Sequence, residues 1–267
     1  MIVSLIDSWM AACPEGEFCG VKDQFSKTVT LQRIFDLHSS LAPSRFLLNL
    51  VWTHSKIVAA IVFALCLRSR ERKEEGADIS LMRFSARAAA GLKGVGPQLP
   101  RFRLAERQPD VALAVVGALL HDVGAYKVSK DGISFDDSYI FHGLYGYLEL
   151  HKAGFGENLA LFAKNHTGSG ISRQEVIKEN LLLPPQDYLP LTAEQKVVAY
   201  ADCFHTKSSP PAFVSFEEAE KRIAQFGKGP KERFKEMEAQ FGRVDLLGLS
   251  EECQMPILGR QLPSCDQ

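Results

Sequence analysis

The sequence predicts an all-α fold, because segment after segment places its apolar residues at helical spacing and no convincing run of alternating strand pattern is present. Residues that stop helices separate these segments. Gly124 and Gly154 stand where C-cap glycines are expected, and the proline pairs at 184–185 and 210–211 prevent a helix from continuing. We therefore expect helices packed on helices through most of the chain.

The N-terminal part of the chain is predicted to contain an extension followed by two helices. Residues 1–28 show no clear period and include Pro14, so they are expected to lie on or near the domain rather than at its centre. A short helix is expected over 31–41. After a break, Ser44 can cap a long helix over 46–67.

The long helix over 46–67 is apolar for most of a length that would span a membrane, which takes about 20 residues. However, Asn49, Thr53 and Lys56 form a polar stripe along it, while apolar residues occupy another stripe. This pattern is typical of a buried amphipathic core helix. We therefore predict no membrane contact.

A polar insertion is predicted over 69–109, where the composition shifts to charged residues, glycine and proline and only 79–92 keeps helical spacing. Further helices are expected after it, at 111–123, 142–153, 157–167, 173–180, 192–205 and 216–226. Residues 224–242 are interpreted as two short amphipathic helices that close the domain. The main domain is therefore expected over 29–250, with 251–267 as a C-terminal tail.

The composition favours an ordinary globular protein that acts on small molecules. The chain has 267 residues, of which 46% are hydrophobic and 24% charged, and this is enough material for one large core. A formal net charge of -1 provides no broad field to attract a nucleic acid polymer or an anionic membrane. Six cysteines without a C-x-x-C pair, and an N-terminus that lacks a basic region, favour a cytoplasmic location.

The strongest local signal is the sequence Ala118-Leu-Leu-His121-Asp122-Val-Gly124, in which an apolar helix ends on adjacent His and Asp residues. Such a pair alone is weakly specific, because a histidine near the negative end of a helix needs no further role. The same anomaly recurs in other helices. Ionisable residues share a helical stripe with apolar residues that should face the core at His54, His166 and Asp202.

Ionisable side chains on several core faces indicate a metal site. An unpaired buried carboxylate would be strongly destabilising or forced to be neutral, and a bound cation removes that penalty. Neutral imidazoles together with carboxylates suit Mn, Fe, Co, Ni or Zn, and one carboxylate can bridge two such ions. A set made of His and Asp without cysteine disfavours a structural zinc site.

These motifs resemble the HD-domain superfamily, which is named for its His-Asp pair, and especially its small stand-alone bacterial and archaeal phosphohydrolases. The resemblance covers roughly residues 31–247 and rests on the ordered motifs VWTHSKIVA, GALLHDVGAYK, FHGLYGYLEL, KNHTGSGIS and KVVAYADCFHTK. It implies an HD-domain helical bundle, here with an N-terminal extension and a polar insertion. Ala125 stands where many members have a basic residue, which leaves the substrate open.

The resemblance also implies a dinuclear metal centre with six ligands. Members with only the minimal pattern H…HD…D hold one ion, and the additional histidines here imply a second. The implied ligands are His54, His121, Asp122, His142, His166 and Asp202. By this resemblance Asp122 bridges the two ions, one held with His54, His121 and Asp202, and the other with His142 and His166. Two divalent transition-metal ions are therefore the expected cofactors.

We expect a hydrolase that cleaves a phosphate ester or anhydride in a nucleotide-like or other small phosphorylated substrate. Asp122 and Asp202 are the candidate catalytic residues, because either can relay a proton from an activated water molecule. Lys127, Arg173 and Lys207 are candidate partners of the substrate phosphate, because each lies close in sequence to a metal ligand.

Other polar residues near the ligands receive more modest interpretations. The loop 167–170 can offer backbone N–H groups to an anion, although a plain helix-ending loop explains it equally well. His205 shares a helical face with Asp202 and can orient a ligand or substrate. His38 and His151 are expected on mixed surfaces without a special role.

Two alternative functions share the same residues. Some members of the superfamily carry the six ligands and cleave C-C or C-P bonds with O2 at two iron ions, so a di-iron oxygenase is the second hypothesis. The third is a non-catalytic sensor module stabilised by metal, suggested by the extension and the insertion. Iron content with redox activity, compared with anaerobic phosphate release, would separate the first two hypotheses.

Overall fold

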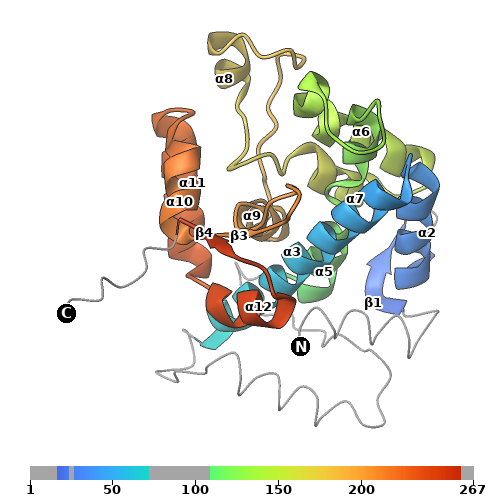
Figure 1. Ribbon diagram of the computed structural model, residues 1–267, viewed down its shortest axis with the longest axis horizontal. Helices are drawn as coiled ribbons and strands as arrows, with labels where there is room; N and C mark the ends of the chain where they lie inside the picture. The colour runs from blue at the N-terminus through green and yellow to red at the C-terminus, as the bar shows by residue number, and fades with distance from the viewer. Residues whose placement is uncertain (1–16, 24–26, 72–108, 260–267) are drawn as a thin grey trace.

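The computed structural model describes residues 17–23, 27–71 and 109–259, and these form a mostly helical domain (Figure 1). This confirms the predicted helical class. The helices are α2 (Leu31–Leu41), α3 (Arg45–Glu71), α5 (Val111–Leu120), α6 (His142–Lys152), α7 (Glu157–Lys164), α8 (Arg173–Lys178), α9 (Ala193–Asp202), α10 (Phe216–Ala224), α11 (Lys228–Phe241) and α12 (Leu246–Cys253), with the 3-10 helices η1 (Val123–Val128) and η2 (Asp137–Phe141).

Three helices that contact one another, α3, α5 and α9, form the centre of the domain. α5 is apolar on nearly every side and is therefore buried on nearly every side. The aromatic rings of Tyr200 and Phe204 at the end of α9 pack edge to face and lie in the same core. Figure 1 shows α10 and α11 on one side of these central helices and α2, α6 and α7 on the other.

Gly124 allows α6 to approach the end of α5 closely. A Cβ atom at Gly124 would lie 1.9 Å from the carbonyl oxygen of His142 and 2.2 Å from the backbone nitrogen of Gly146. Gly124 lies inside η1 without a positive φ, so the prediction that it caps a helix is wrong. Its missing side chain instead makes room for a neighbouring backbone. Gly154, with a φ of 79°, does follow the end of α6 as predicted.

Two small sheets complete the fold. β1 (Glu17–Lys22) pairs antiparallel with β2 (Thr28–Thr30), and β3 (Phe213–Val214) pairs parallel with β4 (Ile257–Leu258). The helical prediction did not include these strands, because runs of two to six residues are too short to show a period. β1 lies in the predicted N-terminal extension and contacts α5, while β4 lies in the predicted C-terminal tail. Most of the predicted insertion, including the helix expected over 79–92, lies outside the described residues.

The segment predicted as two short helices over 224–242 contains one continuous helix, α11, after the end of α10. Pro230 is the third residue of α11, where its missing N–H is one of those that have no partner within the helix. Proline therefore starts this helix and does not interrupt it. The polypeptide turns between the two helices at Gly227, whose φ is 111°.

Two described segments are long and apolar enough to cross a membrane by length and composition, 45–67 and 111–128. In the structure, 72% and 89% of their most apolar windows are buried inside the protein. Core helices of soluble proteins pass the same test, so the two segments are weak evidence for a membrane span.

We expect Gly124→Ala to lower the free energy of unfolding by roughly 1–3 kcal/mol, because the new methyl group would overlap backbone atoms that cannot move independently. Gly229→Ala is the matched control, since its Cβ would meet only the ends of the Glu175 and Arg233 side chains. Urea unfolding monitored by circular dichroism measures both variants. Equal stability of the two variants would contradict the close approach of α6 to η1.

Candidate metal centre

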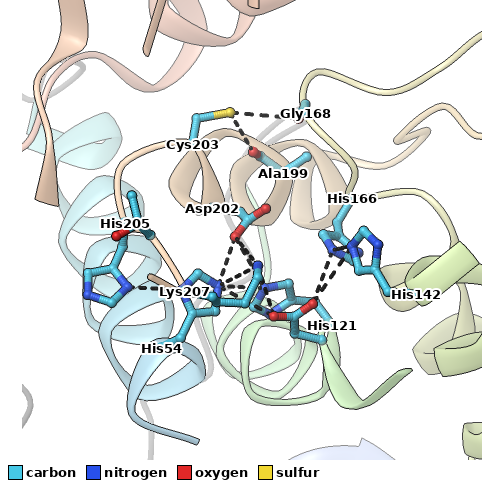
Figure 2. A network of polar contacts seen from close by, with 12 residues as sticks. His54, His121, His142, His166, Gly168, Ala199, Asp202, Cys203, His205 and Lys207 are labelled. Atoms are coloured by element: carbon cyan, nitrogen blue, oxygen red, sulfur yellow. Dashed lines mark hydrogen bonds and ion pairs between the residues drawn. The ribbon is translucent and has the colours of Figure 1, made fainter. Parts of the chain in front are cut away.

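Six predicted ligand residues converge at the ends of four helices and on the middle of a fifth. His121 and Asp122 directly follow α5, and Asp202 is the last residue of α9. His142 begins α6 and His166 follows α7, while His54 lies within α3. Figure 2 shows His54, His121, His142, His166 and Asp202 directed toward a common centre. All six are found in overlapping groups of side chains that can hold a metal ion.

The first half of the cluster surrounds the Nε2 atom of His54. This atom lies 2.9 Å from Oδ1 of Asp202 and 3.3 Å from Nε2 of His121. Oδ2 of Asp122 is 3.7 Å from the same nitrogen. Nε2 of His121 is also 3.4 Å from Oδ1 of Asp202. Two imidazoles and two carboxylates therefore direct one atom each into a small volume.

The second half of the cluster involves the other oxygen of Asp122. Nε2 of His142 lies 3.0 Å from Nε2 of His166. The two nitrogens are 3.8 and 3.7 Å from Oδ1 of Asp122. One carboxylate thus directs its two oxygens toward different histidines, Oδ2 toward His54 and Oδ1 toward His142 and His166.

Hydrogen bonds on the opposite side of the rings fix three of the histidines in one tautomer. Nδ1 of His121 lies 2.6 Å from the carbonyl oxygen of Ala118. The matching distances are 2.6 Å from His142 to Tyr139 and 2.8 Å from His166 to Ala163. A carbonyl oxygen only accepts, so each Nδ1 carries the proton and donates it. Each neutral ring then has a lone pair on Nε2, which is the arrangement found in metal-binding histidines.

The protonation states of the cluster are those of metal ligands. Burial lowers the pKa of His54 to about 4, and burial also holds the pKa values of His142 and His166 below the usual value for histidine. Burial alone would raise the pKa of Asp122, but Lys207 and the surrounding histidines together outweigh burial and keep that pKa well below the usual range. Neutral imidazoles therefore face an ionised carboxylate.

The donor set fits a metal centre, and the clearest sign is at Oδ1 of Asp122. This oxygen is buried and has no hydrogen-bond partner among the described residues. The Nε2 atoms of His142 and His166 lie 3.8 and 3.7 Å from it without a proton, and three lone pairs that face one another cannot form hydrogen bonds. A cation bound between them would satisfy all three.

Lys207 places a positive charge within the first half of the cluster. Its Nζ lies 2.9 Å from Oδ2 of Asp122 and 3.3 Å from Nε2 of His54. The side chain also lines a cavity of about 400 Å³ next to the cluster, together with His142 and Asp202. Ligands of the cluster and this lysine therefore line the same cavity.

The other two predicted phosphate partners do not line this cavity. Lys127 is 42% exposed and lies 3.7 Å from Glu149. Arg173 donates from Nε to the carbonyl of Pro185 and is exposed. Closeness in sequence to a ligand did not place either side chain at the cavity, because Lys127 in η1 and Arg173 at the start of α8 are both exposed.

The cavity wall includes residues that the sequence analysis did not select. The ring of Tyr139 stacks on that of His142, with centroids 4.4 Å apart, and Arg222 lies on α10. Ile223 and Ala219 add an apolar part from the same helix. A surface helix with alternating charges gave no signal for this role, since only the packing of α10 beside α9 brings it to the site.

The loop 167–170 and His38 differ in how well they were predicted. Thr167 and Gly168 line the cavity, which keeps the loop available as an anion site, although the N–H of Gly170 is bonded to the carbonyl of Thr167.

His38 is fully buried, so its predicted surface position is wrong. It donates from Nε2 to the carbonyl of Leu119 and accepts at Nδ1 from the hydroxyl of Tyr126. His38 thereby anchors the end of α5.

Comparisons with known proteins agree with this geometry. A model of the HD domain family matches residues 51–207, which is more than half of the chain and includes all six candidate ligands. An uncharacterized protein of Methanocaldococcus jannaschii is 46% identical over 93 residues, which are 35% of this chain and 48% of that protein. No solved structure matches the chain.

Two further relatives are tRNA (cytidine(56)-2'-O)-methyltransferases. The protein of Thermoplasma volcanium is 37% identical over 93 residues, covering 35% of this chain and 24% of that protein. The protein of Picrophilus torridus is 38% identical over 101 residues, covering 38% and 26%. The matches thus span about half of the first relative and about a quarter of the other two.

Proposed function

The chain belongs to the HD domain family, and we propose that it is a metal-dependent phosphohydrolase with a dinuclear His/Asp centre. Its substrate is a small molecule that carries a phosphate ester or anhydride. The observation that carries the proposal is the carboxylate of Asp122, whose Oδ2 faces Nε2 of His54 and whose Oδ1 faces the Nε2 atoms of His142 and His166.

In this proposal each ion has its own ligands and shares Asp122. His54, His121 and Asp202 would hold the first ion, and His142 and His166 would hold the second. Two divalent ions from the series Mn, Fe, Co, Ni and Zn would lower the pKa of a water molecule and offset the charge that develops on the phosphoryl oxygens. The donor types support this choice, because imidazole and carboxylate suit these metals.

The residues of the chain then divide the remaining work. Asp202 is 14% exposed and lines the cavity, so it is placed to accept a proton from a water molecule there. Asp122 is fully buried and holds the two halves of the centre together. Lys207 faces both the cluster and the cavity and binds a phosphoryl oxygen by a charge-assisted hydrogen bond.

The cavity supports a small substrate. Its volume of about 400 Å³ is at the lower end of sites for small molecules. Lys207 and Arg222 supply positive charge, whereas Val214, Ala219 and Ile223 supply an apolar wall. A nucleotide or a phosphorylated metabolite combines both features. The names of the tRNA methyltransferases describe proteins of which the match covers about a quarter, so an RNA oligonucleotide belongs in the assay as a competing substrate class.

We expect Asp122→Asn to lose bound metal and to lower phosphate release by at least on the order of a hundredfold, because the neutral amide cannot bridge two cations. Asp36→Asn is the control, since Asp36 is exposed on α2 and bonded to Gln32. Elemental analysis of the purified variants gives the metal content. A panel of phosphoesters, assayed anaerobically with added Mn or Co, gives the activity.

The same panel decides between the candidate functions. Unchanged metal content in Asp122→Asn would refute the ligand assignment. Metal-loaded protein that releases no phosphate from any substrate would contradict a hydrolase. Oxygen consumption by the iron-loaded form would then favour the oxygenase with the same ligands.

We expect Lys207→Met to lower kcat/KM by on the order of ten- to a hundredfold, the equivalent of one charge-assisted hydrogen bond of about 1.5–3 kcal/mol. Arg173→Met and Lys127→Met are matched controls, because these side chains do not line the cavity. Steady-state kinetics on the best substrate of the panel measures all three. A larger loss in either control than in Lys207→Met would show that the substrate binds elsewhere.

A further inference from the structure

His54 differs from the other histidines of the cluster in how its second ring nitrogen is satisfied. His121, His142 and His166 each donate from Nδ1 to a backbone carbonyl three residues earlier in the chain. His54 lies within α3, where the carbonyls of the preceding turn accept hydrogen bonds of the helix itself. Its Nδ1 therefore needs a side chain as partner.

That partner is His205. The Nδ1 atoms of His54 and His205 lie 2.9 Å apart, and Figure 2 shows the contact between the two rings. Two ring nitrogens at this distance share one proton, so one ring donates and the other accepts. The direction of this hydrogen bond decides which nitrogen of His54 faces the cluster with a lone pair.

We propose that His205 is a positioning residue that accepts a hydrogen bond from Nδ1 of His54 and thereby keeps Nε2 of His54 free to bind metal. The inference rests on the proposed role of His54 as a ligand. The competing tautomer would place the proton on Nε2, where Oδ1 of Asp202 at 2.9 Å would accept it. His205 thus favours the tautomer that can bind metal over the one that cannot.

The surroundings of His205 suit this role. The residue is 5% exposed and lies in the turn between α9 and β3, where its backbone bridges to Phe213. Its ring also contacts the ring of Phe213, with centroids 5.3 Å apart. Its Nε2 has no hydrogen-bond partner among the described residues. Among these residues, the polar contact of the ring is therefore the one between its Nδ1 and Nδ1 of His54.

Two residues at the end of α9 therefore contribute to the first metal position, one as a ligand and one as the partner of a ligand. Asp202 enters the cluster as a ligand, and His205, three residues later, reaches past it to the far side of the His54 ring. Nε2 of His54 thus faces Asp202, and its Nδ1 faces His205. The second metal position, formed with His142 and His166, lies at the other oxygen of Asp122.

The test compares His205→Asn with His205→Phe. The Oδ1 atom of asparagine takes nearly the place of Nδ1 and can accept the hydrogen bond, whereas phenylalanine fills the space without an acceptor. We expect the phenylalanine variant to bind one of its two metal equivalents about ten- to a hundredfold more weakly, which is the usual effect of removing the hydrogen-bond partner of a metal ligand. The affinity for the other equivalent should be unchanged. The asparagine variant should stay within a few-fold of the wild type for both.

Competition titrations with a zinc chelator measure both affinities, and His151→Phe is the control for replacing a histidine whose ring is bonded to exposed Glu157. The inference would be overturned if His205→Phe bound both metal equivalents with wild-type affinity. It would also be overturned if both affinities fell by the same factor. A wild type that binds no metal would overturn the proposed function instead.

Nitrogen NMR of the His54 ring in the metal-free wild type tests His205 independently of metal and of how well the variants fold. A proton on Nδ1 is expected, and a proton on Nε2 would overturn the inference. In a folded His205→Phe the population should shift toward Nε2.

Discussion

The structure depends on the charge balance around the buried carboxylate of Asp122. It is fully enclosed, and its two oxygens face different sets of imidazole nitrogens. An ionised carboxylate in such a place needs positive charge close by, because solvation by water is lost. Lys207 supplies one charge at Oδ2, while Oδ1 has no hydrogen-bond partner among the described residues. The two sides of this carboxylate define the two halves of the proposed centre.

The fold delivers ligands to this carboxylate mainly from helix ends. A histidine just after a helix can donate back to a carbonyl of its last turn, as His121 and His166 do. The same free carbonyls that end a helix therefore orient the rings. Close contact between η1 and α6, which Gly124 permits, brings His142 to the opposite side of Asp122. His54 arrives from the middle of a helix, and its orientation depends on a side chain from another turn.

Three of the six ligands could be predicted from the helix patterns because each breaks a local rule, whereas the full set was implied by the resemblance to the HD-domain superfamily. Asp202, His54 and His166 stand on helix faces that are otherwise apolar, and such positions are costly unless the side chains meet a common partner. The helical class could also be predicted, because long stretches with apolar residues at helical spacing are the strongest structural signal in a single sequence. Short strands such as β3 and β4 contain too few residues to carry a period.

The cavity was harder to predict, because it is formed by elements that only tertiary packing brings together. Lys127 and Arg173 are near ligands in sequence but point to the surface, whereas Arg222 is distant in sequence and lines the cavity. His38 illustrates the same limit. Its helix has a mixed pattern, and only the contacts with Leu119 and Tyr126 show that it is a core residue.

Anomalous diffraction from crystals of the manganese- or zinc-loaded protein tests the central claim most directly. The account predicts two peaks on either side of Asp122, one within bonding distance of His54, His121 and Asp202 and the other within bonding distance of His142 and His166. A single peak, or peaks away from these side chains, would contradict a dinuclear centre bridged by Asp122.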